Sequence, residues 1–264
     1  MDGGKTPRRI VIKVGTSTLT YANGKLNLRN MDALCRVICD IKNRGDEVIL
    51  VSSGAIAAGL ARLNLPTEKR PDDLPTKQAA AAVGQVALID IYSRFFAAHS
   101  YVTGQILLNS QDVGSEGRRE NLMNTFSALL RLGAIPVVNE NDSVTVKEIV
   151  IGDNDTLSAT VAALLSADLL ILMTDIDGLY DADPRKNPEA RRIDTVSDFD
   201  AAEKLAGGSG TTRGTGGMAT KVQAAREAAA HGIDTVVMGG DDPALLYDVL
   251  EGKPVGTRFQ ASRP

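Results

Sequence analysis

Histidine is scarce in this sequence, which has only two among its 264 residues. His99 and His231 lie far apart in the chain, and neither has neighbours that suggest a catalytic triad. We therefore expect any chemistry here to proceed without a histidine base.

Cysteine is equally rare. Cys35 and Cys39 are the two examples, four residues apart on a predicted amphipathic helix. Buried free cysteines behave as small apolar residues, and this pair has neither the number nor the spacing of a zinc site or a disulfide framework. We expect two core or near-core residues in a protein of a reducing compartment.

Long runs of one residue type are missing as well. The 29 basic and 33 acidic residues give a formal net charge of −4, and Lys and Arg form no run beyond short pairs. This pattern predicts no nucleic-acid or anionic-membrane partner. No stretch reaches the roughly 18 apolar residues of a membrane span, and the polar start leads directly into a strand without a signal-peptide core. We expect a cytoplasmic protein.

The sequence does contain an almost regular alternation of apolar strand patterns and helical patterns. Strands are expected at residues 8–15, 47–54, 101–109, 134–141, 169–175 and 234–240. Helices are expected at residues 27–45, 55–63, 76–99, 118–133, 155–167, 218–232 and 243–252, with another within 198–213. A small hairpin is expected at 144–152. Continuously apolar strands, each followed by a helix, indicate a mainly parallel sheet covered on both faces. We predict one α/β domain over residues 1–264, a three-layer αβα sandwich.

Polar residues and glycine follow several of these strands, where ligands bind in open α/β sheets. These strand ends hold Gly15, Thr16 and Ser17; Ser52, Ser53 and Gly54; residues 139–142; and Thr174 and Asp175. A second polar group, residues 153–155, follows the expected hairpin. Surface loops are also polar, but several such ends together favour a ligand site.

Glycine-containing turns at residues 13–17 and 214–221 suggest phosphate binding, because orphan backbone N–H groups at a helix N-terminus attract anions. The second turn does not fit the Walker A pattern. It matches a dinucleotide fingerprint only loosely, through Gly214, Gly216 and Ala219, and does not directly follow a strand as that motif requires. A kinase of another type is therefore favoured over a dehydrogenase.

Two lysines support this interpretation. Lys13 lies in a strand between Ile12 and Val14, where an unpaired ammonium is costly to bury. It should point at an anion near the strand end, unless it lies at an edge and reaches solvent. Lys221 lies one turn into the helix that follows the second glycine turn, and could also be an ordinary exposed lysine.

Seven motifs in order carry a resemblance to a known family. They are VIKVGTSTLT, VSSGAIAAG, KQAAAAVGQ, VVNENDSV, IGDNDTLSA, TDIDGLYDADPRKNP and GTGGMATK. Together they resemble the amino acid kinase family, and within it the glutamate 5-kinase branch, from residue 8 to about residue 259. Many members of that branch have an additional C-terminal PUA domain, which is not expected here because the sequence stops at Pro264.

The resemblance implies MgATP-dependent phosphorylation of the γ-carboxylate of L-glutamate to L-glutamyl 5-phosphate, the first step of proline biosynthesis. It implies ATP and Mg²⁺ as cofactors, proline as a feedback inhibitor and a homo-oligomer, dimer or tetramer. A downstream glutamyl phosphate reductase is a plausible partner. A carboxylate is already ionised at neutral pH, so this reaction agrees with the lack of a histidine base.

By the same resemblance, residues 8–167 form an amino-acid lobe and residues 168–260 a nucleotide lobe. Lys13, Lys221 and Asp155 are the catalytic residues, with Asp155 holding the two ammonium groups. The amino acid is bound by Ser53, Gly54, Asp142 and Asn154. The residues implied to bind ATP are Lys13, Gly15, Thr174, Asp175, Thr215, Gly216, Gly217, Met218, Ala219, Thr220 and Lys221. No metal ligand is assigned.

Two other functions stay open. One is a related kinase that acts on another small carboxylate or on a carbamate. The other is a non-catalytic sensor of an amino acid or a nucleotide, because fold alone does not fix function. A sensor would not need both lysines and Asp155, and this sequence has all three.

Overall fold

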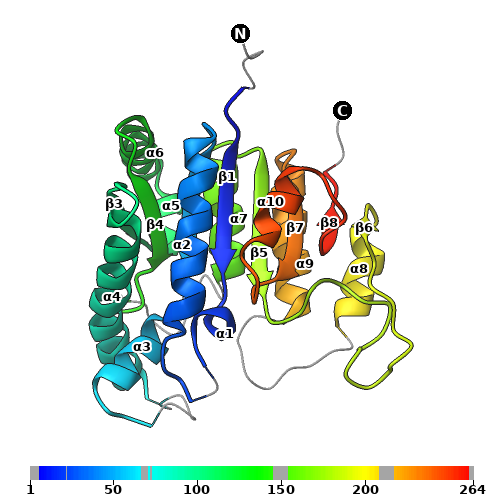
Figure 1. The fold of residues 1–264 in the computed structure, drawn as a ribbon, viewed down its shortest axis with the longest axis horizontal. Coiled ribbons are helices and arrows are strands. Elements are labelled where there is room, and N and C mark those ends of the chain that lie inside the picture. The colour runs from blue at the N-terminus through cyan, green and yellow to red at the C-terminus, as the bar shows by residue number, and fades with distance from the viewer. Residues whose placement is uncertain are drawn as a thin grey trace.

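The computed structural model describes residues 6–21, 23–66, 71, 73–144, 154–207 and 217–261. Their strands join into one eight-stranded sheet (Figure 1) in the order β3-β4-β2-β1-β5-β7-β8-β6. The strands are β1 (Arg9–Val14), β2 (Glu47–Ser52), β3 (Thr103–Leu108), β4 (Ile135–Glu140), β5 (Leu169–Thr174), β6 (Thr195–Val196), β7 (Asp234–Gly239) and β8 (Thr257–Phe259). The helices are α1 (Thr16–Leu19), α2 (Leu28–Asn43), α3 (Ala55–Arg62), α4 (Leu74–Ala97), α5 (Ser110–Gly114), α6 (Glu116–Arg131), α7 (Asn154–Leu164), α8 (Phe199–Ala206), α9 (Met218–Ala230) and α10 (Leu245–Leu250).

The sheet is parallel at every pairing except that of β7 with β8, which is antiparallel. All six strands and eight helices expected from the sequence are confirmed, with ends shifted by a few residues. The short strands β6 and β8 and the short helices α1 and α5 were not predicted. Elements of two to five residues are too short to show a hydrophobic period. The expected hairpin at 144–152 lies outside the described residues, apart from Val144.

Helices cover both faces of the sheet, as predicted. Alternate residues of β1 belong to different cores, because side chains alternate across a strand. Ile10 and Ile12 pack in one core with α2, α3, α4 and α10. Val11 packs in the other with α6, α7, α8 and α9. Figure 1 shows α2 and α10 in front of the sheet and α7 and α9 behind it. The three-layer αβα class is confirmed.

Helix α4 is the described helix whose length and apolar composition would also suit a membrane span. Core helices can have the same length and composition. Tyr92 and Phe96 of α4 are fully buried in the core. Helix α3 packs very closely on α4. A Cβ atom built on Gly59 or Gly84 would lie 1.7 Å from a backbone oxygen of the other helix, so this contact requires glycine on both sides.

The two cysteines of α2 are both buried and free, which confirms their expected place in the core. Burial raises the pKa of the Cys39 thiol to about 11, against a smaller opposing effect of Lys42. A thiol held in its neutral form is a poor nucleophile and metal ligand.

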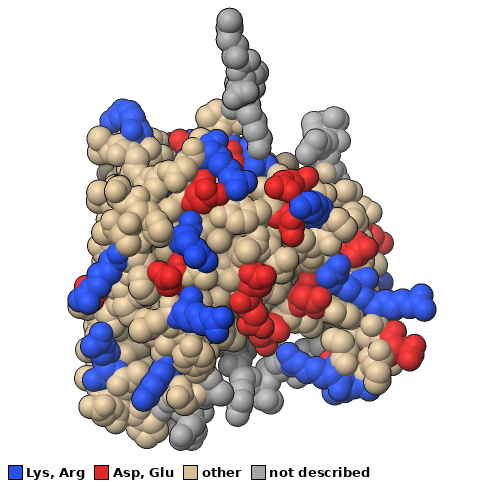
Figure 2. Space-filling model, in the orientation of Figure 1, with Lys and Arg blue, Asp and Glu red and all other residues tan. Residues whose placement is uncertain are grey.

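On the face shown in Figure 2, basic side chains are scattered among acidic ones and form no continuous basic surface. The strands β1, β4, β5 and β7 end at the lower edge of the sheet in Figure 1, and β2 runs parallel between β1 and β4. The strand ends singled out in the sequence therefore meet at one edge.

Candidate active site

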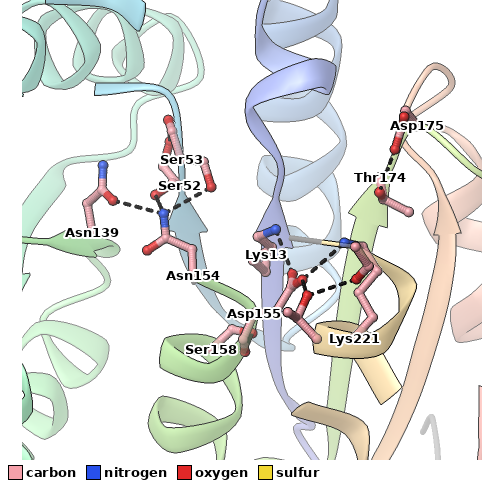
Figure 3. Close-up of polar contacts among 12 residues, drawn as sticks. Lys13, Ser52, Ser53, Asn139, Asn154, Asp155, Ser158, Thr174, Asp175 and Lys221 are labelled. Carbon is pink, nitrogen blue, oxygen red and sulfur yellow. Dashed lines mark hydrogen bonds and ion pairs between the residues drawn. The ribbon is translucent and has the colours of Figure 1, made fainter. Parts of the chain in front are cut away.

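Three charged side chains meet beneath the carboxyl ends of the central strands (Figure 3). Lys13 Nζ lies 2.6 Å from Asp155 Oδ1, and Lys221 Nζ lies 3.0 Å from Asp155 Oδ2. Lys13 and Lys221 are each 3% exposed, and Asp155 is 0% exposed. Neither lysine reaches solvent as an ordinary surface lysine does. The two ammonium groups share one buried carboxylate.

Each member of this lysine–aspartate triad comes from a different element. Lys13 is the penultimate residue of β1 and lies on the face covered by α7 and α9. Asp155 is in the first turn of α7, where the helix dipole favours a negative charge. Lys221 is in the first turn of α9. The fold thus joins residues 13, 155 and 221, which are far apart in the sequence.

The charges within the triad stabilise the ionised carboxylate. Burial alone would raise the pKa of Asp155, but the charges and hydrogen bonds of Lys13 and Lys221 outweigh it and hold that pKa well below its usual range. With two ammonium groups and one carboxylate, the three side chains carry one net positive charge. A buried group of this charge favours an anion as its ligand.

A hydroxyl group completes the surroundings of Asp155. Thr220 Oγ1 lies 3.0 Å from Asp155 Oδ2 and 2.8 Å from the backbone oxygen of Gly217. A threonine hydroxyl has one proton to donate, so it serves one of these acceptors at a time. Gly217 is the N-cap of α9, and Met218 and Ala219 follow it in the first turn.

A second polar cluster lies at the ends of β2 and β4. Asn154 Nδ2 is within hydrogen-bond distance of Ser52 O (3.2 Å), Ser53 Oγ (3.0 Å) and Asn139 Oδ1 (3.2 Å). An amide nitrogen has two protons, so it can satisfy two of these three acceptors well. Asn154 Oδ1 is buried, and no hydrogen-bond partner for it exists within the described ranges. It is an acceptor available to a donor that enters the site.

The backbone beside this amide cluster turns at Gly54. Gly54 is the N-cap of α3 and has φ +90°, a conformation that a residue with a side chain rarely adopts. Ser53 is buried, and its N–H donates to Val14 O at 3.2 Å. Asp142 lies in the turn that follows β4 and is partly exposed. The ends of β1, β2 and β4 are therefore adjacent.

A cleft of about 280 Å³ opens beside Lys221. Its walls are the end of β5 with the loop that follows it, α8 and the N-terminus of α9. The residues are Thr174, Asp175, Ile176, Gly178, Leu179, Tyr180, Asp181, Ala182, Asp183, Pro184, Arg185, Lys204, Leu205, Gly217, Met218 and Lys221. This volume is near the lower end of the range for small-ligand sites, about 300–1,000 Å³. The helix terminus on one wall suits a phosphate.

The residues predicted from the sequence thus divide between two places joined by the triad. Asn154, Ser53, Gly54 and Asp142 lie at the ends of β2 and β4, and Thr174, Asp175, Gly217, Met218 and Lys221 line the cleft. Gly15 lies between them, and its N–H donates to Met173 O at 3.2 Å. Thr215 and Gly216 lie outside the described residues.

Sequence reasoning did not assign a role to Asn139, which is 4% exposed and accepts hydrogen bonds from Asn154 and from the Glu140 N–H. The signal was an amide at the end of an otherwise apolar strand. The cleft residues Tyr180, Arg185 and Lys204 were missed too, because their loop and helix patterns are those of ordinary surface.

Both histidines are exposed, His99 just after α4 and His231 just after α9. Each shortly precedes a strand, so both lie at the amino edge of the sheet, away from the triad. Within the part of the chain that the structure describes, no group of three or more His, Cys, Asp or Glu side chains could hold a metal ion.

The sequence pattern of the amino acid kinase family matches residues 8–239. A carbamate kinase of Giardia lamblia bound to AMP-PNP superposes with a TM-score of 0.69 at 18% identity, over 97% of this chain and 99% of that one. An isopentenyl phosphate kinase gives a TM-score of 0.65 at 18% identity, over 96% of this chain and all of the other. The chain belongs to the amino acid kinase family.

Within that family its sequence is similar to glutamate 5-kinases. The glutamate 5-kinase of Clostridium perfringens is 49% identical over 264 residues, 98% of this chain and 97% of the relative. That of Clostridium tetani is 52% identical over 97% of this chain and 96% of the relative. The glutamate 5-kinase of Caldanaerobacter subterraneus is 54% identical over 95% of this chain, and the match covers 67% of the relative's length.

Proposed function

We propose that this protein uses ATP to phosphorylate the γ-carboxylate of L-glutamate, giving L-glutamyl 5-phosphate for proline biosynthesis. The observation that carries this proposal is the buried triad of Lys13, Asp155 and Lys221, which lies between an amide-lined cluster and a cleft that Lys221 also lines. Similarity to glutamate 5-kinases over nearly the whole chain supports the choice of substrate.

The reaction joins one oxygen of the γ-carboxylate to the γ-phosphorus of ATP and breaks the bond from that phosphorus to the β–γ bridging oxygen. ADP takes the electron pair of that bond. The attacking carboxylate is ionised at neutral pH, so no general base is needed. The chemical problem is to bring two anions together and to stabilise charge on the transferring oxygens.

Lys13 and Lys221 are suited to that task. Their ammonium groups are buried, point at one locus and are fixed by the carboxylate of Asp155. Because their surroundings exclude water, each charge acts more strongly than it would at the surface. Lys221 also lines the cleft, which supports contact with the phosphates of ATP. Asp155 acts as the organiser of both lysines.

The amide cluster is proposed to bind the amino acid. The ammonium group of glutamate needs acceptors, and the buried Asn154 Oδ1 and the nearby Asp142 carboxylate are of the right type. Ser53 and Gly54 would contact the other side of the substrate. N-acetylated glutamate has no ammonium, so a pocket that left these acceptors unpaired would bind it about 1–3 kcal/mol less well.

The nucleotide is proposed to occupy the cleft, with Gly217 and the N-terminus of α9 beside its phosphates. Thr174 and Asp175 at the end of β5 would face the same ligand, and Gly15 would lie by the transferring group. Residues 8–167 and 168–260 would then form the amino-acid and nucleotide halves.

Mg²⁺ fits this site chiefly as a companion of ATP. It prefers oxygen ligands, often phosphates and water with few protein carboxylates, and Asp155 is already bound by two lysines. When bound, Mg²⁺ would neutralise charge on the nucleotide phosphates. We assign it no protein ligand.

Several further expectations from the family resemblance stay predictions. They are feedback inhibition by proline, a homodimer or homotetramer, passage of the product to a glutamyl phosphate reductase, and action in the cytoplasm. Analytical ultracentrifugation and proline titration of the purified enzyme would test the first two.

The function is tested by incubating the protein with MgATP and hydroxylamine, which converts an acyl phosphate to a hydroxamate. L-Glutamate, L-aspartate and N-acetyl-L-glutamate are compared side by side. We expect hydroxamate and ADP from L-glutamate only. Hydroxamate from another acid would show a kinase with a different substrate. ATP binding without any product would favour a non-catalytic sensor.

A further inference from the structure

Tyr92 places a polar group in an otherwise apolar environment. It lies on α4, is fully buried and belongs to the core cluster formed with α2. Its hydroxyl oxygen is 3.0 Å from Ser52 Oγ, at the end of β2. Buried tyrosine hydroxyls usually have a partner, but this partner adjoins the proposed amino-acid site.

Ser52 Oγ has a second contact, 3.1 Å from the backbone oxygen of Ser53, which can only accept. A serine hydroxyl has one proton. When Ser52 donates that proton to Ser53 O, it accepts from Tyr92, and the two contacts together define the rotation of the serine hydroxyl.

Ser52 also contacts the amide cluster. Asn154 Nδ2 is 3.2 Å from Ser52 O and 3.0 Å from Ser53 Oγ (Figure 3). Tyr92 thus contacts the side chain of Ser52, and Asn154 contacts the Ser52 backbone oxygen and the Ser53 hydroxyl, so the backbone of residues 52–53 links the two contacts. Asn154 is the side chain whose buried Oδ1 is available to a ligand.

Little free space surrounds these groups. A cavity of about 10 Å³ is lined by Ser52, Gln85, Tyr92, Gln105 and Asn139 with neighbouring apolar residues. Gln85 Nε2 donates to Glu140 O at 3.3 Å. Packing and hydrogen bonds together therefore hold these side chains in place.

We propose that Tyr92 is a positioning residue of the amino-acid pocket, acting through Ser52 on Ser53 and Asn154. It does not touch the reacting atoms. This inference rests on the proposed function, because it names glutamate as the ligand of that pocket. Its ring stacks against Phe96 at 6.2 Å, a contact that phenylalanine at position 92 would keep.

Tyr92→Phe therefore removes the hydroxyl and little else. We expect it to raise the KM for L-glutamate about 3- to 10-fold, with the KM for ATP and kcat close to wild type. Tyr101→Phe is the matched control, since the Tyr101 hydroxyl donates to Asn43 at 2.8 Å in an exposed place, and it should change neither constant. In a Ser52→Ala background, Tyr92→Phe should have little further effect.

An unchanged glutamate KM in Tyr92→Phe, even with a lowered melting temperature, would overturn the proposal and leave Tyr92 a core residue. Equal rises in both KM values would overturn it as well. Hydroxamate formation by the wild type in the same assay reports on the proposed function separately. If the wild type forms no hydroxamate, the affinity for L-glutamate is measured instead by calorimetry, in the wild type and in Tyr92→Phe. If the wild type does not bind L-glutamate, both proposals are wrong.

Discussion

Asp155→Asn is the most informative single change in this molecule, because asparagine has nearly the same shape but no charge. In the wild type the carboxylate lies 2.6 Å from Lys13 Nζ and 3.0 Å from Lys221 Nζ, and all three residues are buried. The variant retains two ammonium groups that no longer share an anion. We expect both the stability and the turnover of the enzyme to fall.

The size of the effect can be worked from the geometry. At a separation on the order of 5 Å and an effective dielectric constant of about 20, two ammonium groups repel by about 3 kcal/mol. Removal of one partner of a buried ion pair costs about 3–5 kcal/mol. We expect the free energy of unfolding to fall by that amount at pH 7, and kcat to fall by at least about 100-fold.

The pH dependence gives a second and independent check. The lysines hold the pKa of Asp155 below its usual range despite burial. The stabilisation from this carboxylate is therefore fully present above the unfolded-state pKa of about 3.9, and is lost as pH falls below it. The difference in unfolding free energy between wild type and Asp155→Asn should be constant from about pH 8 to pH 5 and shrink below about pH 4.

Urea unfolding followed by circular dichroism across this pH range is the assay. Asp200→Asn is the matched control, because Asp200 pairs with Arg226 at 2.6 Å on an exposed surface, where an ion pair contributes little to stability. If Asp155→Asn were as stable and as active as Asp200→Asn, the reasoning about the triad would be refuted.

Three further predictions concern the two lysines, the amino-acid pocket and the fold. Lys13→Ala or Lys221→Ala should lower kcat by at least about 100-fold while circular dichroism shows an intact fold; wild-type turnover in both would remove them from the catalytic site. Asp142→Ala should raise the KM for L-glutamate about tenfold or more and the KM for ATP far less; equal effects would show that it is not a substrate residue. Asn30→Ala should reduce the free energy of unfolding by about 2–4 kcal/mol, because its buried Nδ2 donates to two backbone carbonyls, one in α1 and one just after β7. Asn43→Ala, at an exposed position of the same helix, is the control for Asn30→Ala in urea unfolding. Equal stability of these two variants would contradict the predicted role of Asn30.

Much of the fold could be predicted because the central strands and the covering helices are long and regular. Strand β5 is buried along its whole length and apolar from Leu169 to Met173, and helix α2 shows a clear apolar stripe that includes Cys35 and Cys39. The short strands β6 and β8 could not be predicted, since their two and three residues owe their conformation to pairing with each other and with β7.

The site also contains residues that could be predicted from the sequence and residues that could not. Lys13 stood out because a lysine in an apolar strand needs an anionic partner, and its burial agrees with that reasoning. Its contact with Asp155, 142 residues away in the chain, was implied by resemblance and not by any local pattern. Tyr92 gave no signal at all, because a tyrosine on an apolar helix face is most often a core residue. Only the three-dimensional fold places its hydroxyl against Ser52.

The central claim is that a glutamate oxygen becomes bonded to phosphorus. It is tested most directly with L-glutamate labelled with ¹⁸O at both γ-carboxylate oxygens, incubated with the enzyme, unlabelled MgATP and hydroxylamine. Attack of hydroxylamine at the γ-carbon releases phosphate with the bridging oxygen. The account predicts phosphate containing one ¹⁸O atom per hydroxamate formed, measured by mass spectrometry. Unlabelled phosphate, released at the rate of ADP, would mean simple hydrolysis of ATP and would contradict it.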